Sequence, residues 1–187
     1  VNKRSTNLNR VYRVNNISRR FCAGEMTVEE AQEELKEIRT NIEYGFLHKC
    51  IGYIMTSAFF AVLFGENWLD CVAAGVVGLV LALAVTGASR LRFNDFCQNA
   101  AGSFALAVTA LLIQRLVFFS MNIDAVIISA IMPMVPGVTF TAAIRDTLNG
   151  DYSSGVARIA EAIVVALGVA SGVGAAMVVF GMMGGGL

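Results

Sequence analysis

The pattern of hydrophobic and polar positions divides the chain into a polar beginning and a long apolar remainder. After residue 46, runs of Leu, Val, Ala, Ile and Gly alternate with short polar stretches. Five of these runs reach about 20 residues, the length that a helix needs to cross a hydrocarbon core. The predicted spans are 47–64, 69–88, 101–119, 123–144 and 156–183. We therefore expect an all-α, polytopic membrane protein whose transmembrane domain, 47–187, has five helices.

The polar head, residues 1–46, shows helical periodicity of another kind. Apolar side chains recur at helical spacing among arginines, which predicts an amphipathic helix over 7–21. A second helix is predicted over 28–41, because Thr27 and Glu30 have the spacing of a capping box. We expect a cytoplasmic helical hairpin. A basic face that lies on anionic lipid headgroups is the alternative.

The fourth predicted span is interrupted by two prolines and a glycine, followed by two threonines. Proline removes an amide hydrogen and frees a carbonyl in the preceding turn, and such groups are costly in lipid unless something satisfies them. A break into two half-helices would place free amides near residues 138–141, where they could bind a carboxylate. A proline kink that only shapes packing is the alternative. The predicted substrate-binding residues are Pro133, Pro136, Gly137, Thr139, Thr141 and Arg145.

Charged residues concentrate directly after this break. An arginine at membrane depth is costly, so Arg145 is expected to have a role or a partner, and Asp146, Asp151 and Glu161 are the candidate partners. Two interpretations remain open: an ion-pair cluster that closes the cytoplasmic side as a gate, or interfacial charges held among headgroups. The candidate gating or coupling residues are Asp146, Arg158 and Glu161.

Composition supports a membrane protein and suggests its orientation. The chain is 56% hydrophobic and 15% charged, with a mean hydropathy of +0.65, which disfavours a soluble globular domain. Basic residues concentrate in the head and in the connections that would lie on the same side, at Arg90, Arg92 and Arg145. By the positive-inside rule, the N-terminus is expected to be cytoplasmic and the C-terminus outside the inner membrane.

The sequence contains no catalytic motif that we can identify. It has no phosphate-binding loop and no paired-histidine motif, its four cysteines lack metal-ligand spacing, and the basic residues of the head are matched by acids. We expect neither a cofactor, a metal site nor a nucleic-acid partner. Two other functions stay open: a membrane-embedded enzyme that uses Asp146 and Glu161 as acid and base, and an anchor or scaffold for the head.

The stretch PMVPGVTFTAAIRDTLNGDYSSGVARIAEA, together with CAGEMTVEEAQEEL in the head, resembles the threonine/serine exporter family, particularly its split two-component form linked to succinate export. The resemblance implies a secondary transporter, not an enzyme, that exports an amino acid or a dicarboxylate. It also implies an oligomer in which a second five-span membrane subunit completes an inverted repeat. The matching positions are Pro133, Pro136, Gly137, Arg145, Asp146, Gly150, Gly155, Arg158 and Glu161.

Overall fold

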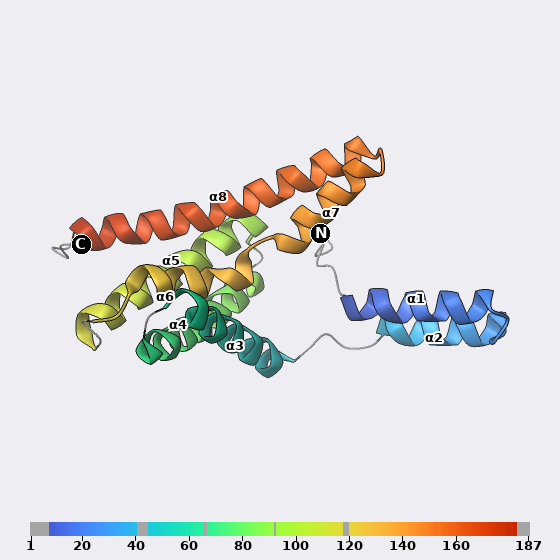
Figure 1. Ribbon diagram of the computed structural model, residues 1–187, viewed down its shortest axis with the longest axis horizontal. Helices are drawn as coiled ribbons and strands as arrows, with labels where there is room; N and C mark the ends of the chain where they lie inside the picture. The colour runs from blue at the N-terminus through green and yellow to red at the C-terminus, as the bar shows by residue number, and fades with distance from the viewer. Residues whose placement is uncertain (1–7, 41–44, 66, 92, 118–119, 183–187) are drawn as a thin grey trace. The chain divides into compact units, whose positions relative to one another are not determined.

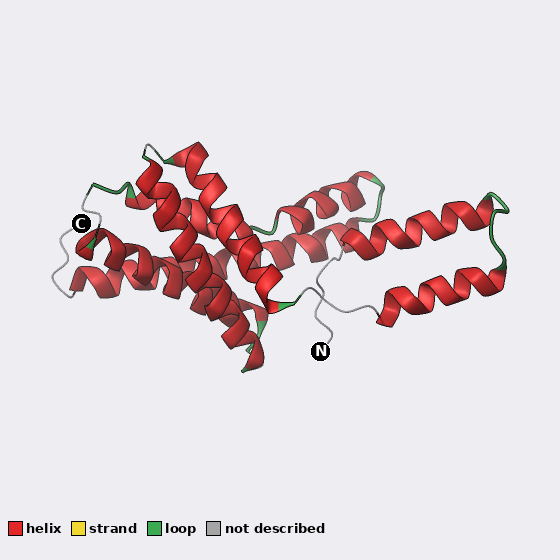
Figure 2. Cartoon of the chain, turned by 90° about the horizontal axis from the view of Figure 1, so that it is seen from below, coloured by secondary structure: helices red, strands yellow, loops and turns green. Residues whose placement is uncertain are grey.

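The protein is all-helical in the part of the chain that the computed structural model describes, which is residues 8–40, 45–65, 67–91, 93–117 and 120–182. It forms two compact units, Val1–Gly45 and Phe46–Leu187 (Figures 1 and 2). Four of the described helices are long and apolar enough to cross a membrane, and a fifth crossing results if one bent helix pair counts as a single span. The all-α membrane fold is thereby confirmed, with four to five candidate spans.

The first unit consists of α1 (Leu8–Cys22) and α2 (Val28–Thr40), which lie side by side in Figure 1. Gly24 has a φ of 74°, a left-handed conformation that a side chain disfavours, and it turns the chain between the helices. The predicted capping box is present. The Thr27 amide donates to a Glu30 carboxylate oxygen at 2.8 Å, and the Glu30 amide donates to the Thr27 hydroxyl at 3.3 Å.

The second unit contains six α-helices and one short 3₁₀ turn among its described residues. They are α3 (Phe46–Phe64), α4 (Trp68–Arg90), α5 (Asp95–Leu116), α6 (Ile123–Ile131), η1 (Met132–Met134), α7 (Gly137–Leu148) and α8 (Tyr152–Met182). The predicted spans agree with these bounds within a few residues, except at the start of α5.

Helix α5 begins at Asp95, six residues before the predicted span of 101–119. The side chain of Asn94 accepts a hydrogen bond from the Cys97 amide at 2.8 Å and so begins the helix at Asp95. The polar residues are thus the first turns of a helix. Arg92, one of the basic residues from which the orientation was predicted, lies outside the described residues.

A sharp bend separates α6 from α7. The segment Ile123–Met134 and helix α7 differ in direction by 56°. Pro133 lies in η1, and Pro136 occupies the position immediately before α7. Proline cannot donate to the preceding turn and is well placed at a helix start, so the interruption falls where the prolines predict it.

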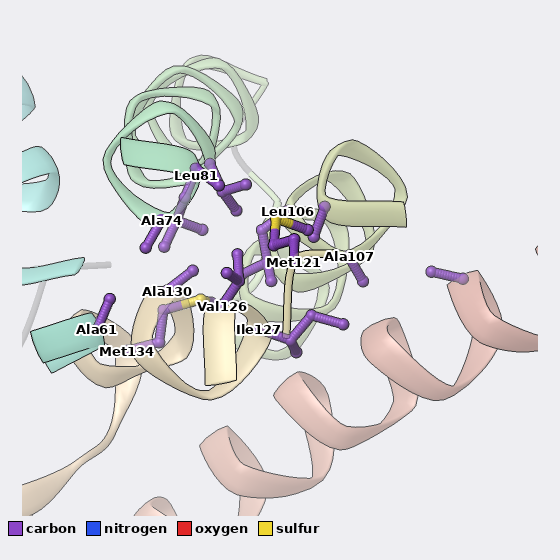
Figure 3. Packing of buried hydrophobic residues seen from close by; sticks show 14 of the residues in the cluster. Ala61, Ala74, Leu81, Leu106, Ala107, Met121, Val126, Ile127, Ala130 and Met134 are labelled. Atoms are coloured by element: carbon purple, nitrogen blue, oxygen red, sulfur yellow. The ribbon is translucent and has the colours of Figure 1, made fainter. Parts of the chain in front are cut away.

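The core of the second unit forms where α6 packs against α3, α4 and α5. Figure 3 shows side chains of α4, α5 and α6 converging there, with Leu81, Leu106 and Val126 fully buried. By contrast, α7 packs mainly against α8, and α8 packs along α5. The two halves of the bent pair therefore have different neighbours.

Close approach of α5 and α8 depends on glycine. A side chain at Gly172 would collide with the Ser103 hydroxyl and the Ala100 carbonyl oxygen, and one at Gly168 would lie 3.0 Å from the Phe96 carbonyl oxygen. Backbones approach this closely only where side chains are small. At Gly174, by contrast, a side chain would meet nothing within 4 Å. It lies on the exposed face, because its spacing from Gly172 does not match a helical turn.

Candidate functional site

The N-terminus of α7 has backbone amides without acceptors. Pro136 precedes the helix, and no side chain caps it. The Gly137 amide donates to the Val135 carbonyl at 2.8 Å, and the first bond of the helical type runs from the Phe140 amide to the Pro136 carbonyl at 2.9 Å. The amides between them, of residues 138 and 139, have no acceptor among the described residues. A helix start of this kind carries partial positive charge and attracts anions.

The two predicted threonines differ in their availability. The Thr141 hydroxyl donates back to its own helix and lies 3.0 Å from the Gly137 carbonyl oxygen and 3.1 Å from that of Val138. The half-buried Thr139 has no side-chain hydrogen bond within the described part of the protein. Nothing lies within 4 Å of the position that a side chain at Gly137 would take. Thr139 and the free amides therefore share an open helix end.

An ion pair joins α7 to α8 near the other end of α7. The Arg158 Nε lies 2.8 Å from the Asp146 Oδ2, and the two side chains are 45% and 27% exposed. The helices also approach closely at Gly155, where a side chain would collide with the Thr147 hydroxyl. That hydroxyl donates to the Ala143 carbonyl at 2.9 Å. The ion pair and the close contact together hold α7 against the beginning of α8.

The turn between α7 and α8 is built by local rules. Gly150 has a φ of 88°, which glycine tolerates best. The Asp151 carboxylate accepts a hydrogen bond from the Ser154 amide at 3.1 Å and so caps the start of α8. Hydrogen bonds from the Ser154 hydroxyl and amide hold the pKa of Asp151 below its ordinary value, and the charge of Arg158 adds to this effect.

The predicted charge cluster is only partly assembled. Asp146 and Arg158 are paired, whereas Arg145 and Glu161 are exposed and form no ion pair with the described residues. Asp151, another candidate partner for Arg145, serves as a helix cap. A closed network of all the candidate gating residues is therefore not present in this conformation.

A buried carboxylate that was not among the predicted site residues connects two helices. Asp70 lies in the first turn of α4 and is fully buried. Its Oδ2 accepts from the Asn67 amide at 3.2 Å, and its Oδ1 accepts from the Asn122 amide at 3.1 Å. Asn122 precedes α6, so one carboxylate connects the starts of two helices. The Asn67 to Asp70 spacing of a capping box was the signal that could have identified this role.

Comparisons with known proteins agree with this architecture. Residues 1–180 match the family model ThrE, described as "Putative threonine/serine exporter". The chain is 23% identical over 174 residues to a "Probable threonine/serine exporter" of Mycobacterium tuberculosis. The aligned region covers 92% of this chain and 32% of that relative. The chain thus spans about a third of that curated relative. No solved structure gives a significant match.

A family match over nearly the whole chain is more decisive than the modest pairwise identity. It covers the head, the candidate spans and the bend between α6 and α7 together, in one order. The apolar helices agree with the membrane location that this family implies. The chain belongs to the threonine/serine exporter family of membrane transporters.

Proposed function

We propose that this chain is one half of a secondary transporter that exports small carboxylate-bearing metabolites, such as threonine, serine or a succinate-like dicarboxylate, across the inner membrane. In this proposal the bent pair of α6 and α7 is a single, broken fourth span, so the chain crosses the membrane five times. The N-terminal head is cytoplasmic, and the C-terminus is outside. The observation that carries the proposal is the uncapped start of α7 within an apolar helical unit.

The carboxylate of the solute binds at the start of α7. The amides of residues 138 and 139 and the Thr139 hydroxyl are the donors, since they have no acceptor among the described residues. Pro133 and Pro136 hold the break open, and the absence of a side chain at Gly137 lets the solute approach the backbone. Thr141 contributes at most its lone pairs, because its hydroxyl already donates to the backbone.

Arg145 acts on the approach of the solute and not at the carboxylate site itself. It lies eight positions beyond Gly137 in the sequence, which corresponds to about 12 Å along a helix. That separation between backbone positions favours a role for Arg145 on the approach of the solute. The exposed guanidinium attracts anions toward the helix end through its long-range field.

The Asp146 and Arg158 pair acts as a gate between α7 and α8. Glu161 lies three residues after Arg158 on α8, a spacing at which side chains on a helix can meet. When α7 moves away from α8, Arg158 exchanges Asp146 for Glu161 and does not lose its partner. Asp146 is then free to carry a coupling proton.

Five crossings leave the two ends of the chain on opposite sides of the membrane. A second subunit of five spans would enter with inverted topology and complete the solute path from the other side. The partner is therefore expected to be another polytopic membrane protein.

The deciding experiment measures uptake and counterflow of labelled threonine, serine and succinate in proteoliposomes. Vesicles contain this chain alone, a candidate five-span partner alone, or both. Transport that needs both chains supports the two-component proposal, and the solute that exchanges identifies the cargo. Transport by this chain alone refutes the half-transporter proposal. No movement of any of the three solutes under any condition rejects the proposed substrates.

A further inference from the structure

The head has an unusually small core for an independently folded unit. Ile17, Met26 and Ile38 are its buried hydrophobic residues within the described range. Helices of 15 and 13 residues are marginal in water without tertiary burial, and small units bury too little surface to be more than marginally stable. The pair therefore needs additional apolar contact to be stable.

The two edges of this helix pair differ in character. One edge carries two ion pairs, Arg13 with Glu37 at 3.6 Å and Arg20 with Glu34 at 3.0 Å. On helical spacing, Arg13 and Arg20 lie on one side of the buried Ile17. The ion-paired edge is therefore already occupied within the head.

The opposite edge, which we call the apolar edge, is formed by Val14, Phe21, Val28 and Leu35. These side chains are 43%, 45%, 52% and 42% exposed, in that order. They are seven residues apart on each helix, so they lie in line along it. The register of the ion pairs places Val14 level with Leu35, and Phe21 level with Val28. The edge thus presents two apolar layers that no described residue of the head covers.

The net charges of the two helices are opposite in sign, so α1 of one head is complementary to α2 of a second copy. Helix α1 carries Arg10, Arg13, Arg19 and Arg20 and has no acidic residue. Helix α2 carries Glu29, Glu30, Glu33, Glu34 and Glu37, against Lys36 and Arg39. A two-fold axis parallel to the helices lays α1 of one copy against α2 of the other. Every neighbouring pair is then antiparallel and opposite in charge.

We propose that the apolar edge is a dimer interface, through which the heads of two copies of this chain form an antiparallel four-helix bundle. Val14 and Leu35 of both copies form one core layer, and Phe21 and Val28 of both copies form the other. The interface buries apolar side chains that are exposed in a single head, which meets the need left by its small core. The interface does not depend on the identity of the transported solute.

Disulfide trapping in the full chain tests this interface. Two differently tagged chains, both free of the native Cys22, Cys50, Cys71 and Cys97, are co-expressed in membranes, one with Val14→Cys and the other with Leu35→Cys. Oxidation is expected to give a covalent heterodimer at twice the mass of the chain. Asn15→Cys with Glu33→Cys is the matched control, because both residues are exposed on the same helices but away from the apolar edge. This control pair is expected to stay monomeric.

A second pair, Phe21→Cys with Val28→Cys, tests the other layer. It keeps the test decisive if the cysteines of the first pair disturb their own layer. Elution as one symmetric peak in detergent shows that each variant is folded. Maleimide labelling of the same cysteines separates the remaining outcomes. Rapid labelling without cross-linking means that the edge is open, and slow labelling without cross-linking means that lipid or another part of the chain covers it. Either result overturns the proposal, as does equal cross-linking of the control pair.

Discussion

The Arg158 Nε on α8 lies 2.8 Å from the Asp146 Oδ2 on α7, and it is the ion pair that joins two helices within the described part of the second unit. The two residues are twelve positions apart, and the intervening turn brings them together. Because α7 packs mainly on α8, this contact bears directly on the position of the half-helix whose start is the candidate site.

Exchange of the two charges tests this contact. We expect Arg158→Asp or Asp146→Arg alone to lower transport and thermal stability, and the double exchange to restore much of both. Exposed pairs contribute roughly 0.2–1 kcal/mol, and this pair is partly exposed, so the coupling energy in a double-mutant cycle should fall in that range. A coupling energy of zero, with full transport by both single variants, would remove the pair from the gate.

Gly172 and Gly174 of α8 provide a matched test of helix packing. Gly172→Leu is expected to destabilise the protein by about 1–3 kcal/mol, the usual cost of overpacking, because its side chain would meet Ser103 and Ala100. Gly174→Leu should be tolerated, since a side chain there meets nothing within 4 Å. Thermal unfolding in detergent, monitored by Trp68 fluorescence, compares the two. Equal losses of stability would contradict the assigned packing of α5 on α8.

Asp70 is expected to stabilise the fold and not to take part in solute binding. Asp70→Ala removes the acceptor of two part-buried hydrogen bonds, from the amides of Asn67 and Asn122, and a hydrogen bond to a charged group contributes about 1.5–3 kcal/mol. Asp124→Ala, in the exposed first turn of α6, is the control for loss of a carboxylate. The KM for the transported solute should be unchanged in whatever Asp70→Ala protein remains folded. A selective rise in KM would assign Asp70 a role in transport instead.

The cap at the start of α8 should depend on pH. The pKa of Asp151 is held below its ordinary value of 3.8 in the folded protein, so the ionised carboxylate stabilises the fold above that pH. This contribution is lost as the pH falls through the lowered folded pKa. Asp151→Ala should therefore melt below the wild type at pH 7, and the difference should shrink in acid. Ser154→Ala, which removes the hydroxyl donor, should move the pKa of Asp151 back toward 3.8 in a carboxyl NMR titration.

The two threonines of α7 should respond differently to removal of their hydroxyl groups. Thr139→Val is expected to raise the KM for the solute, because its hydroxyl has no partner within the described residues and belongs to the first turn of α7, beside the free amides in the chain. Thr141→Val should change the KM less, since its hydroxyl already donates to the Gly137 and Val138 carbonyls. Loss of one hydrogen bond corresponds to about 0.5–1.5 kcal/mol, or roughly a two- to tenfold change in KM. A larger effect at Thr141 would reverse the assignment of the two residues.

Local sequence rules were sufficient for much of this protein. The apolar runs predicted the long helices, because a 20-residue apolar segment has few alternatives to a membrane helix. The capping box of Thr27 and Glu30 depends only on atoms within one helical turn, so it could be predicted from the sequence. The same holds for the helix interruption at Pro133 and Pro136. Gly24 ended α1 for the same reason.

Tertiary structure decided what lay between helices. Several acids were equally plausible partners for the arginines, and only the packing of α7 on α8 selected Asp146 for Arg158 and left Glu161 exposed. The buried Asp70 carboxylate accepts a hydrogen bond from the amide of Asn122, fifty-two residues away. From residue type alone, the glycines of α8 that face α5 cannot be distinguished from those on the exposed face. In each case the deciding contact lies between different helices. Spacing along the sequence determines which side of a helix a residue occupies, but it does not determine which residue of another helix lies opposite.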